Sequence, residues 1–490
     1  MSFSEYLGSY IKEYEVSLPK LAKQVGIDRV TLFRYTTGDR KPANDKIVKN
    51  IANALCMSAA EKEHLLDEYD KSVMGEDIVN SYKYMCKMMN SLADVNDLLD
   101  PKYNFQKESD TADFTQEDES TIIKSQQALL SYIVRMLYNA AKSDSSSDRI
   151  MILMQPTNTK VQEMLIPLLS GADVTVDQII CFEKNIEKSY LNLEALENII
   201  TQSFALKNYN VYYHYEILSS FLSSSALLPN VIIACGCMVT FNSDMTRGFF
   251  SRYPKLVDFI SEEFDSIKKN CSRLIEESNY ALDIGSMQLI VQGTKIGSIF
   301  EQPCIAPCCD RKNLNETLCD FPAKQYIIDT LIRQNGDWNG LERTESGLYV
   351  EKIISCCTKE GIELFLKTGR VGEFPEMYYN ALSYEFRLEI LKRMVILQKQ
   401  GMISYYIIKE PLNLLNNMQC YWSVDDIAVS FRQIKKDSML QISMKEASIF
   451  NTVLNFIEYL KIKNMLIKDD DVIEYLEDLI KKAENHYFRG

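Results

Sequence analysis

Apolar residues near the start of the chain recur every three or four positions, which is the spacing of short amphipathic helices. Two such runs meet at Gly26, a residue that can adopt the positive φ of a tight turn. Ala22 has little bulk and lets the two helices cross closely, while Asp28 is placed to cap the second helix. The pattern therefore predicts two short helices joined by a turn within residues 17–42. The apolar face that joins them consists of Leu21, Val25, Ile27 and Leu32.

A third periodic stretch begins at Asn44, and a capping box at residues 58–61 indicates one more helix. We therefore expect residues 1–70 to form an all-helical domain. The apolar face of the third stretch consists of Ile47, Val48, Ile51, Ala52 and Leu55.

This region resembles the Cro and phage-repressor (Xre-type) family of helix-turn-helix transcription regulators. The matching motif, within residues 3–70, is Leu-Ala-x-x-x-Gly-Ile, then Thr-Leu-x-Arg-Tyr-x-x-Gly-x-Arg-x-Pro, then Ile-Ala-x-Ala-Leu. The chain departs from the family at Pro19, in the first turn of the leading helix, and at Thr36, where many members carry Glu. Proline is tolerated in a first turn because its position has no N–H bond to lose. A small helical bundle that uses the same packing to contact proteins is the alternative.

The charge of this region suits DNA binding. Residues 17–49 hold eight Lys and Arg against three Asp, a net charge of +5, in a chain of net charge −14. Such a patch attracts phosphates, while the acidic remainder avoids non-specific association with nucleic acid. In the resembled family the second helix of the motif enters the major groove, where Arg can contact guanine and Val or Phe a thymine methyl.

The resemblance assigns two sets of residues to DNA. Base edges are expected to face Arg29, Val30, Phe33 and Arg34. Phosphates are expected to meet Lys20, Lys23, Arg40, Lys41, Asn44 and Lys46. A solvated basic face is the alternative for any single lysine among them.

Residues 71–104 are predicted to form a connecting helix, and the acidic residues 105–120 a linker. The connecting helix carries a short apolar seam that could pair with its copy, or pack on its own chain as an ordinary amphipathic helix. A homodimer is expected in either case, because related proteins bind two half-sites. The seam consists of Ile78, Tyr82, Met85, Met89 and Leu92.

From residue 121 onward, apolar runs of strand length alternate with amphipathic runs of helix length. This alternation favours a large α/β region with a mixed, mostly parallel sheet, which we divide into halves at 121–320 and 321–490. Strands are expected at 149–154, 178–182, 211–215, 228–239, 287–291, 403–408 and 427–431. Helices are expected at 122–141, 160–169, 193–206, 255–275, 385–398, 444–460 and 472–484.

A strand, a polar loop and a long helix occur at 231–275 and again at 427–461, which suggests an internal duplication. Phospholipase D-like domains, some of which serve as sensors in transcription regulators, are built from two such halves, and the topology here resembles theirs. Their catalytic His-x-Lys pattern is missing, because Tyr215 and Glu216 follow His214.

Motifs for catalysis are absent from the sequence: it has no phosphate-binding loop, no dinucleotide-binding glycine pattern, no nucleophile elbow and no His-Glu-x-x-His. We therefore expect no enzyme activity and no cofactor. The spacing of Cys304, Cys308, Cys309 and Cys319 does not match a zinc ribbon, and packed free thiols are favoured there over metal or redox sensing.

A ligand site is expected beyond the carboxyl ends of the strands, where α/β sheets bind small molecules. Two polar segments fit this place, although structural turns explain them equally well. The candidate ligand-binding residues are Gln155, Thr157, Asn242, Ser243, Asp244 and Arg247.

With 490 residues, 46% hydrophobic and 25% charged, the chain is expected to form several globular domains. It shows no signal peptide or membrane span, so we expect a cytoplasmic protein with free thiols. The expected function is a sequence-specific DNA-binding transcription regulator whose C-terminal region senses a small molecule or a protein partner. The alternatives are an enzyme or defence-type effector, such as a phosphodiesterase, with an autoregulatory DNA-binding domain, or a protein-interaction scaffold.

Overall fold

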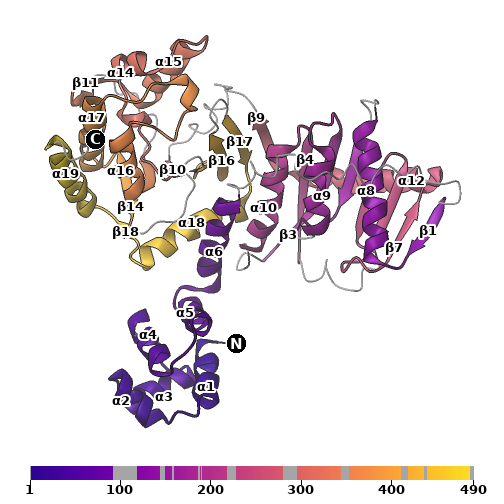
Figure 1. Ribbon diagram of the computed structural model, residues 1–490, viewed down its shortest axis with the longest axis horizontal. Coiled ribbons are helices and arrows are strands. Elements are labelled where there is room, and N and C mark those ends of the chain that lie inside the picture. Colours follow the sequence, from indigo (N-terminus) through magenta and orange to yellow (C-terminus); the bar gives the residue numbers. More distant parts are fainter. Residues whose placement is uncertain are drawn as a thin grey trace. The chain divides into compact units, whose positions relative to one another are not determined.

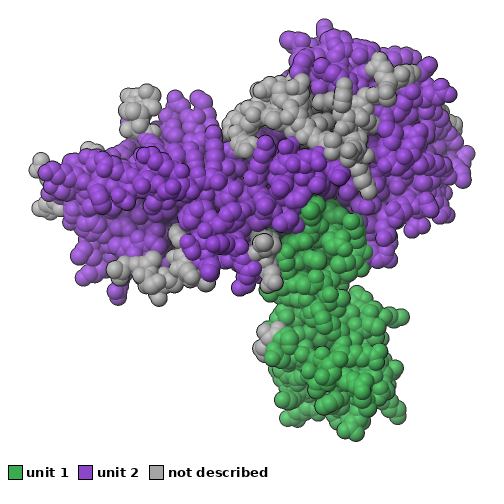
Figure 2. Space-filling model, turned by 180° about the vertical axis from the view of Figure 1, so that it is seen from behind, with its two compact units in different colours: residues 1–83, 452–463 green, residues 84–451, 464–490 purple. Residues whose placement is uncertain are grey.

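The computed structural model describes residues 2–91, 119–143, 149–156, 159–185, 188, 190–217, 228–279, 295–343, 352–409, 418–434 and 439–485. The chain forms two compact units (Figure 2). Unit 1 comprises residues 1–83 and 452–463, and unit 2 comprises residues 84–451 and 464–490. No helix in the described ranges combines the length and the apolar character needed to cross a membrane.

Unit 1 is built from helices (Figure 1). Their bounds are α1 (Phe3–Glu13), α2 (Leu18–Val25), α3 (Arg29–Thr37), α4 (Asp45–Ala54), α5 (Ala59–Met74), the first part of α6 (Glu76–Ser91) and the last part of α18 (Ala447–Ile462). The apolar faces predicted from the sequence meet in one core, in which Leu7, Leu21, Leu32, Val48, Ile51 and Leu65 are fully buried.

The start of α6 is held by the end of α18. The ring of Tyr82 stacks on those of Phe456 and Tyr459, with centroid distances of 5.6 and 4.0 Å. The Lys463 ammonium, just beyond α18, lies 2.7 Å from the carboxylate of Asp70 on α5. Met85 and Met89, further along α6, are also buried by the chain itself. This is the packing of an ordinary amphipathic helix, the alternative to a seam between two copies; Leu92 lies outside the described residues.

The first sheet of unit 2 has the strand order β1-β7-β6-β5-β2-β3-β4-β8 in the described residues. The strands are β1 (Ser120–Ile123), β2 (Arg149–Leu153), β3 (Thr175–Glu183), β4 (Tyr209–Glu216), β5 (Asn230–Ala234), β6 (Cys237–Phe241), β7 (Gly248–Ser251) and β8 (Ser272–Arg273). The helices α8 (Gln126–Lys142), α9 (Thr159–Leu169) and α10 (Tyr190–Ala205) follow one another along this sheet (Figure 1). Tyr132 of α8 packs on Phe250, and on the opposite face Val257 of α12 (Pro254–Lys269) packs on Ile233.

The second sheet has the order β18-β14-β13-β10-β15-β16-β17-β9. Its strands are β9 (Ile275–Asn279), β10 (Lys295–Ile299), β13 (Lys352–Thr358), β14 (Ile403–Ile408), β15 (Met418–Ser423), β16 (Ala428–Ile434), β17 (Met439–Met444) and β18 (Leu466–Ile467). Its helices are α14 (Arg311–Thr317), α15 (Lys324–Asn335), α16 (Lys359–Thr368), α17 (Tyr384–Lys399), α18 and α19 (Asp470–Glu484), and a small hairpin joins β11 (Trp338–Asn339) to β12 (Glu342–Arg343).

The two sheets repeat one topology. In each, three parallel strands are joined by helices, an antiparallel meander of three strands follows, and a long helix leads to a short edge strand. Strands β2 to β8 thus correspond to β10 and β13 to β18, and β1 corresponds to β9. The expected alignment of the two repeats is shifted by one strand. The counterpart of β5 is β15, whereas the sequence pattern matches the segment that begins at residue 231 with the one that begins at residue 427.

Three expectations about this region are wrong. The sheets are mixed but not mostly parallel, because β5, β6 and β7 are joined by short turns, and only a longer crossover can place successive strands parallel. The expected strand 228–239 is two strands with a turn at Cys235 and Gly236 between them. The expected helix 122–141 begins only at Gln126: the β-branched residues before it form β1, and the Ser125 hydroxyl caps α8 by accepting a hydrogen bond from Ala128 N–H. The expected strand 287–291 lies outside the described residues.

Gly361, in the first turn of α16, offers a test of this packing. A Cβ atom there would lie 1.8 Å from the carbonyl oxygen of Glu301, so backbone would have to move. We expect Gly361→Ala to lower the free energy of unfolding by about 1–3 kcal/mol or more, measured by urea denaturation and circular dichroism. Gly8→Ala in α1 is the control, because its nearest new contact is an ordinary 3.9 Å. Equal stability of the two variants would contradict the close approach.

Candidate nucleic-acid interface

The turn between α2 and α3 has the local structure that its sequence predicts. Gly26 adopts a φ of +77° and ends α2, with its N–H donating to Ala22 O. One carboxylate oxygen of Asp28 accepts from Val30 N–H at 2.8 Å, and the other accepts from the backbone and the hydroxyl of Thr31 at 3.1 and 2.6 Å. These bonds, that of the Thr31 hydroxyl first, lower the pKa of Asp28, and they fix the first turn of α3.

α3 has one buried and one exposed face. Leu32 and Tyr35 are buried in the core of unit 1, whereas the side chains of Val30 and Phe33 are 55% and 52% exposed. Arg29 and Arg34 are exposed as well. The helical period places these four residues on the side away from the core, so the predicted base readers share one outward surface.

The predicted phosphate contacts lie on the segments before and after α3 in the chain. Lys20 and Lys23 on α2 are exposed, as are Arg40 and Lys46. Two of the predicted residues have partners within unit 1. The Lys41 ammonium donates to Ser72 O, and the Asn44 side-chain oxygen caps α4 by accepting from Ile47 N–H at 3.2 Å.

The predicted ligand-binding residues lie at the end of the first sheet where β2 and β6 finish. Gln155 is buried, and its Nε2 has no hydrogen-bond partner in the described residues; Thr157 lies outside them. The segment from Asn242 to Arg247 closes on itself: Arg247 N–H donates to Asn242 Oδ1 at 2.9 Å, and the Thr246 hydroxyl to Asp244 at 2.7 Å. Ser243 is exposed on this turn. These bonds are those of a structural turn between β6 and β7.

A buried polar cluster at the same end of the second sheet was not found from the sequence. The Arg432 guanidinium donates to Gln441 Oε1 at 3.0 and 3.2 Å and to the Tyr421 hydroxyl at 3.2 Å. Burial raises the pKa of nearby Glu373, which accepts a hydrogen bond from Ile305 N–H. An arginine in an apolar strand was the only signal. The cavity beside Glu373 measures about 40 Å³, room for a few waters, and its lining is mostly apolar.

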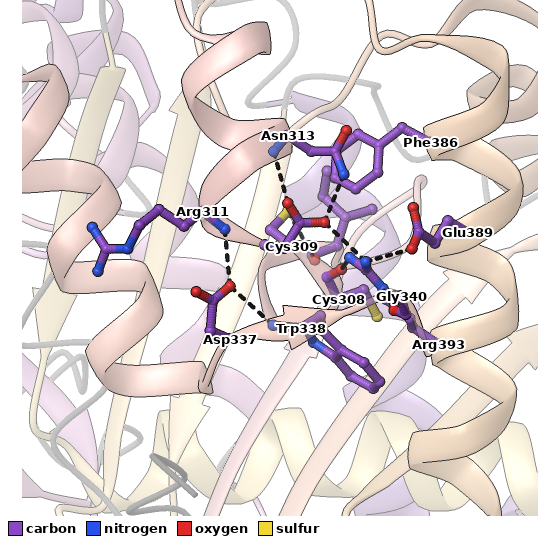
Figure 3. A network of polar contacts seen from close by, with 12 residues as sticks. Cys308, Cys309, Arg311, Asn313, Asp337, Trp338, Gly340, Phe386, Glu389 and Arg393 are labelled. Atoms are coloured by element: carbon purple, nitrogen blue, oxygen red, sulfur yellow. Dashed lines mark hydrogen bonds and ion pairs between the residues drawn. The ribbon is translucent and has the colours of Figure 1, made fainter. Parts of the chain in front are cut away.

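Two of the four thiols predicted to be packed core residues lie beside a buried arginine, whereas Cys304 and Cys319 are partly exposed. Cys308 and Cys309 are buried, and the Arg393 guanidinium donates to Cys308 O at 2.7 Å. The same guanidinium lies 2.8 Å from the Asp310 carboxylate and 2.7 Å from that of Glu389 (Figure 3). Among the described residues, no three His, Cys, Asp or Glu side chains group in a way that could hold a metal ion.

Comparisons with known proteins give distant similarities. No family model and no curated protein matches the chain. A phosphatidylserine synthase from Haemophilus influenzae Rd KW20 is similar over 76% of this chain and 95% of its own, with 9% identity and a TM-score of 0.19. TrmBL2, an archaeal chromatin protein, is similar over 55% of this chain and 98% of its own, with 10% identity and a TM-score of 0.24.

A third structure, a polyphosphate kinase from Porphyromonas gingivalis, is similar over 74% of this chain and 54% of its own, with 11% identity and a TM-score of 0.22. Similarity at this level carries no argument about what the present chain binds or does. The Xre-type resemblance of the first 70 residues stays a prediction.

The thiols differ in exposure, which predicts their reactivity. Burial raises the pKa of Cys308 to about 12 and that of Cys309 well above its usual value, so few thiolates form there at neutral pH. Cys56 is the one exposed thiol of the thirteen, all of which are described. We expect Ellman's reagent to titrate one thiol rapidly at pH 7.5, and Cys56→Ser to abolish this fast phase. A fast phase that persists in the variant would contradict the placement of Cys56 as the one exposed thiol.

Proposed function

We propose that the chain is a sequence-specific DNA-binding transcription regulator in which α2 and α3 form a helix-turn-helix. The observation that carries the proposal is the outer face of α3, where two large apolar side chains are half exposed between two arginines. Exposed apolar side chains bordered by charge are typical of a surface that meets a partner. The groove of DNA offers partners for both kinds of side chain, because thymine methyl groups contact Val30 and Phe33 and guanine edges contact Arg29 or Arg34.

The charge distribution supports DNA as that partner. The segment 17–49 carries a net charge of +5 within a chain of −14. Lys20, Lys23, Arg40 and Lys46 are exposed around the outer face of α3 and would contact phosphates. Because the rest of the chain is acidic, contacts with a duplex are confined to this segment.

The large α/β unit is assigned the sensing of a small molecule or a protein partner, and the regulator is assigned a homodimeric state. A homodimer that binds two DNA half-sites gains both affinity and specificity from its two helix-turn-helix domains. An effector that favours one arrangement of the two heads would then change the affinity for the operator.

The proposal is tested by sequencing the genomic DNA that is recovered with the purified full chain and measuring affinity for the enriched sequence. We expect selective duplex binding that weakens steeply as salt increases, because binding releases counterions from phosphates. Equal affinity for all duplexes, or no binding at low salt, would overturn it.

Single substitutions separate base contacts from phosphate contacts. We expect Arg34→Ala to cost about 1–3 kcal/mol at the enriched site and to relax its sequence preference. Lys23→Ala should weaken binding about equally on all sequences and reduce the salt slope by about one. Arg247→Ala, which removes an exposed charge from the turn between β6 and β7, is the control and should leave DNA affinity unchanged. Fluorescence anisotropy over a salt series measures all three, and an Arg34→Ala variant with unaltered selectivity would contradict the assignment of α3.

A further inference from the structure

The first sheet ends at β1, whose outer side faces no other strand of the described residues. β1 pairs with β7 on its inner side (Figure 1). In this pair Ser120 is opposite Ser251 and Ile122 is opposite Phe249. Natural proteins protect such edges with charges, prolines or bulges, because unpaired N–H and C=O groups recruit further strands. β1, Ser-Thr-Ile-Ile, is short, which itself limits pairing, but it contains no charge, proline or bulge.

Large apolar side chains accompany this edge. Ile122 is 71% exposed, more than any other large apolar residue described. Its partner Phe249 packs in the cluster that α12 forms on one face of the sheet, so Ile122 lies on that same face. Tyr253, which follows Arg252 whose N–H donates to Glu119 O just before β1, is 44% exposed. The edge therefore combines unpaired backbone with an apolar surface.

The equivalent edge of the second sheet is covered within the chain. β9 pairs with β17 as β1 pairs with β7, and the other side of β9 contacts β4 of the first sheet. Side chains reinforce that junction, because the Tyr215 hydroxyl donates to Glu446 and Asn192 Nδ2 donates to the Ser448 hydroxyl at 2.8 Å. At the far end, after β18, the chain adds α19, which packs on α17 and β14 and has no counterpart after β8. Thus β9 of the second repeat lies at a junction within the chain, whereas no described residues cover the equivalent edge at β1 of the first repeat.

We propose that β1 pairs with β1 of a second copy of this chain, antiparallel and around a two-fold axis, so that the two first sheets become one. Directly opposed residues of antiparallel strands point to the same face, so the axis must pass midway between one residue and the same residue of the second copy. Centring the pair on Ile122 places the two most exposed isoleucines side by side beneath the two α12 helices. This inference rests on the homodimer of the proposed function, for which it names an interface. Its tests contain no DNA, so a negative result here is distinguishable from a failure of DNA binding.

Sedimentation of the wild-type chain over a range of concentrations gives the first test. We expect a dimer of the 56.5 kDa chain. Ile122→Lys places two ammonium groups opposite each other and should weaken dimerisation by at least about tenfold. Val424→Lys, at an exposed apolar residue in the turn after β15, is the matched control and should leave the dimer intact. A monomeric wild type, a dimer that Ile122→Lys leaves unchanged, or a larger assembly would overturn the proposal.

Disulfide trapping tests the register. Directly opposed residues in antiparallel strands have Cα atoms about 4.5–5.5 Å apart, within the range that a disulfide bridges. In a Cys56→Ser background, Ile122→Cys should form a covalent dimer on mild oxidation, whereas Val424→Cys should not. Because Ile122 is exposed, its variants should melt at the wild-type temperature. Absence of the covalent dimer in a variant that still sediments as a dimer would overturn the centring on Ile122.

Discussion

A β-sheet has two edges, and every unpaired backbone group there must find water, a covering element or another strand. This constraint organises unit 2. The chain passes from β8, at the edge of the first sheet, directly to β9, at the edge of the second, with only Leu274 between them. Leu274 N–H donates to Val211 O, so the connection itself continues the hydrogen bonding of the first sheet. Because the two repeats are joined at this point, the β8 edge of the first sheet and the β9 edge of the second lie next to each other in the chain.

Buried charges follow the same rule that polar groups must be satisfied. Arg393 and Arg432 are both almost fully buried in the second repeat. Arg393 has two carboxylates and two carbonyl oxygens around it, whereas Arg432 has amide and hydroxyl oxygens as its hydrogen-bond partners. Arg393 joins segments far apart in the sequence, whereas Arg432 joins the neighbouring strands β15, β16 and β17. Removing a partner of either guanidinium would leave a buried charge less well compensated. These contacts position Cys308 and the strand ends around Tyr421 without implying chemistry at either.

The sequence predicts local structure well where one residue decides it. Gly26 is suited to a positive φ at the end of a helix, and Asp28 is suited to cap the start of one. The structure shows Gly26 ending α2 and Asp28 capping α3. Strand 211–215 and the helix at 385–398 also follow from their apolar period, since β4 and α17 cover them. Short apolar runs such as Thr121 to Ile123 fit a strand or a helix equally, and only the pairing with β7 decides between them.

In the candidate interface, the sequence predicts some features and misses others. Exposure of Val30 and Phe33 follows from the helical period once Leu32 is assigned to the core. The roles of Lys41 and Asn44 do not, because their partners Ser72 and Ile47 depend on how α4 and α5 pack. The approach of Glu373 to Ile305 and to Arg432 joins segments more than fifty residues apart, for which single-sequence patterns carry no signal.

The sequence also could not predict that the end of α18 completes unit 1, because the two segments are far apart in the chain. This packing determines which fragment can represent the helix-turn-helix in experiments. Burial raises the pKa of Asp70 even though the Lys463 ammonium lies 2.7 Å away. Without Lys463, this carboxylate would be buried with no opposite charge, and Tyr82 would lose the rings of Phe456 and Tyr459. A fragment that ends near residue 83 therefore exposes apolar surface that the full chain buries. α18 begins in unit 2 and ends in unit 1, so the last turns of a helix from the second repeat pack on Tyr82 of α6, and Lys463 just beyond them pairs with Asp70 of α5.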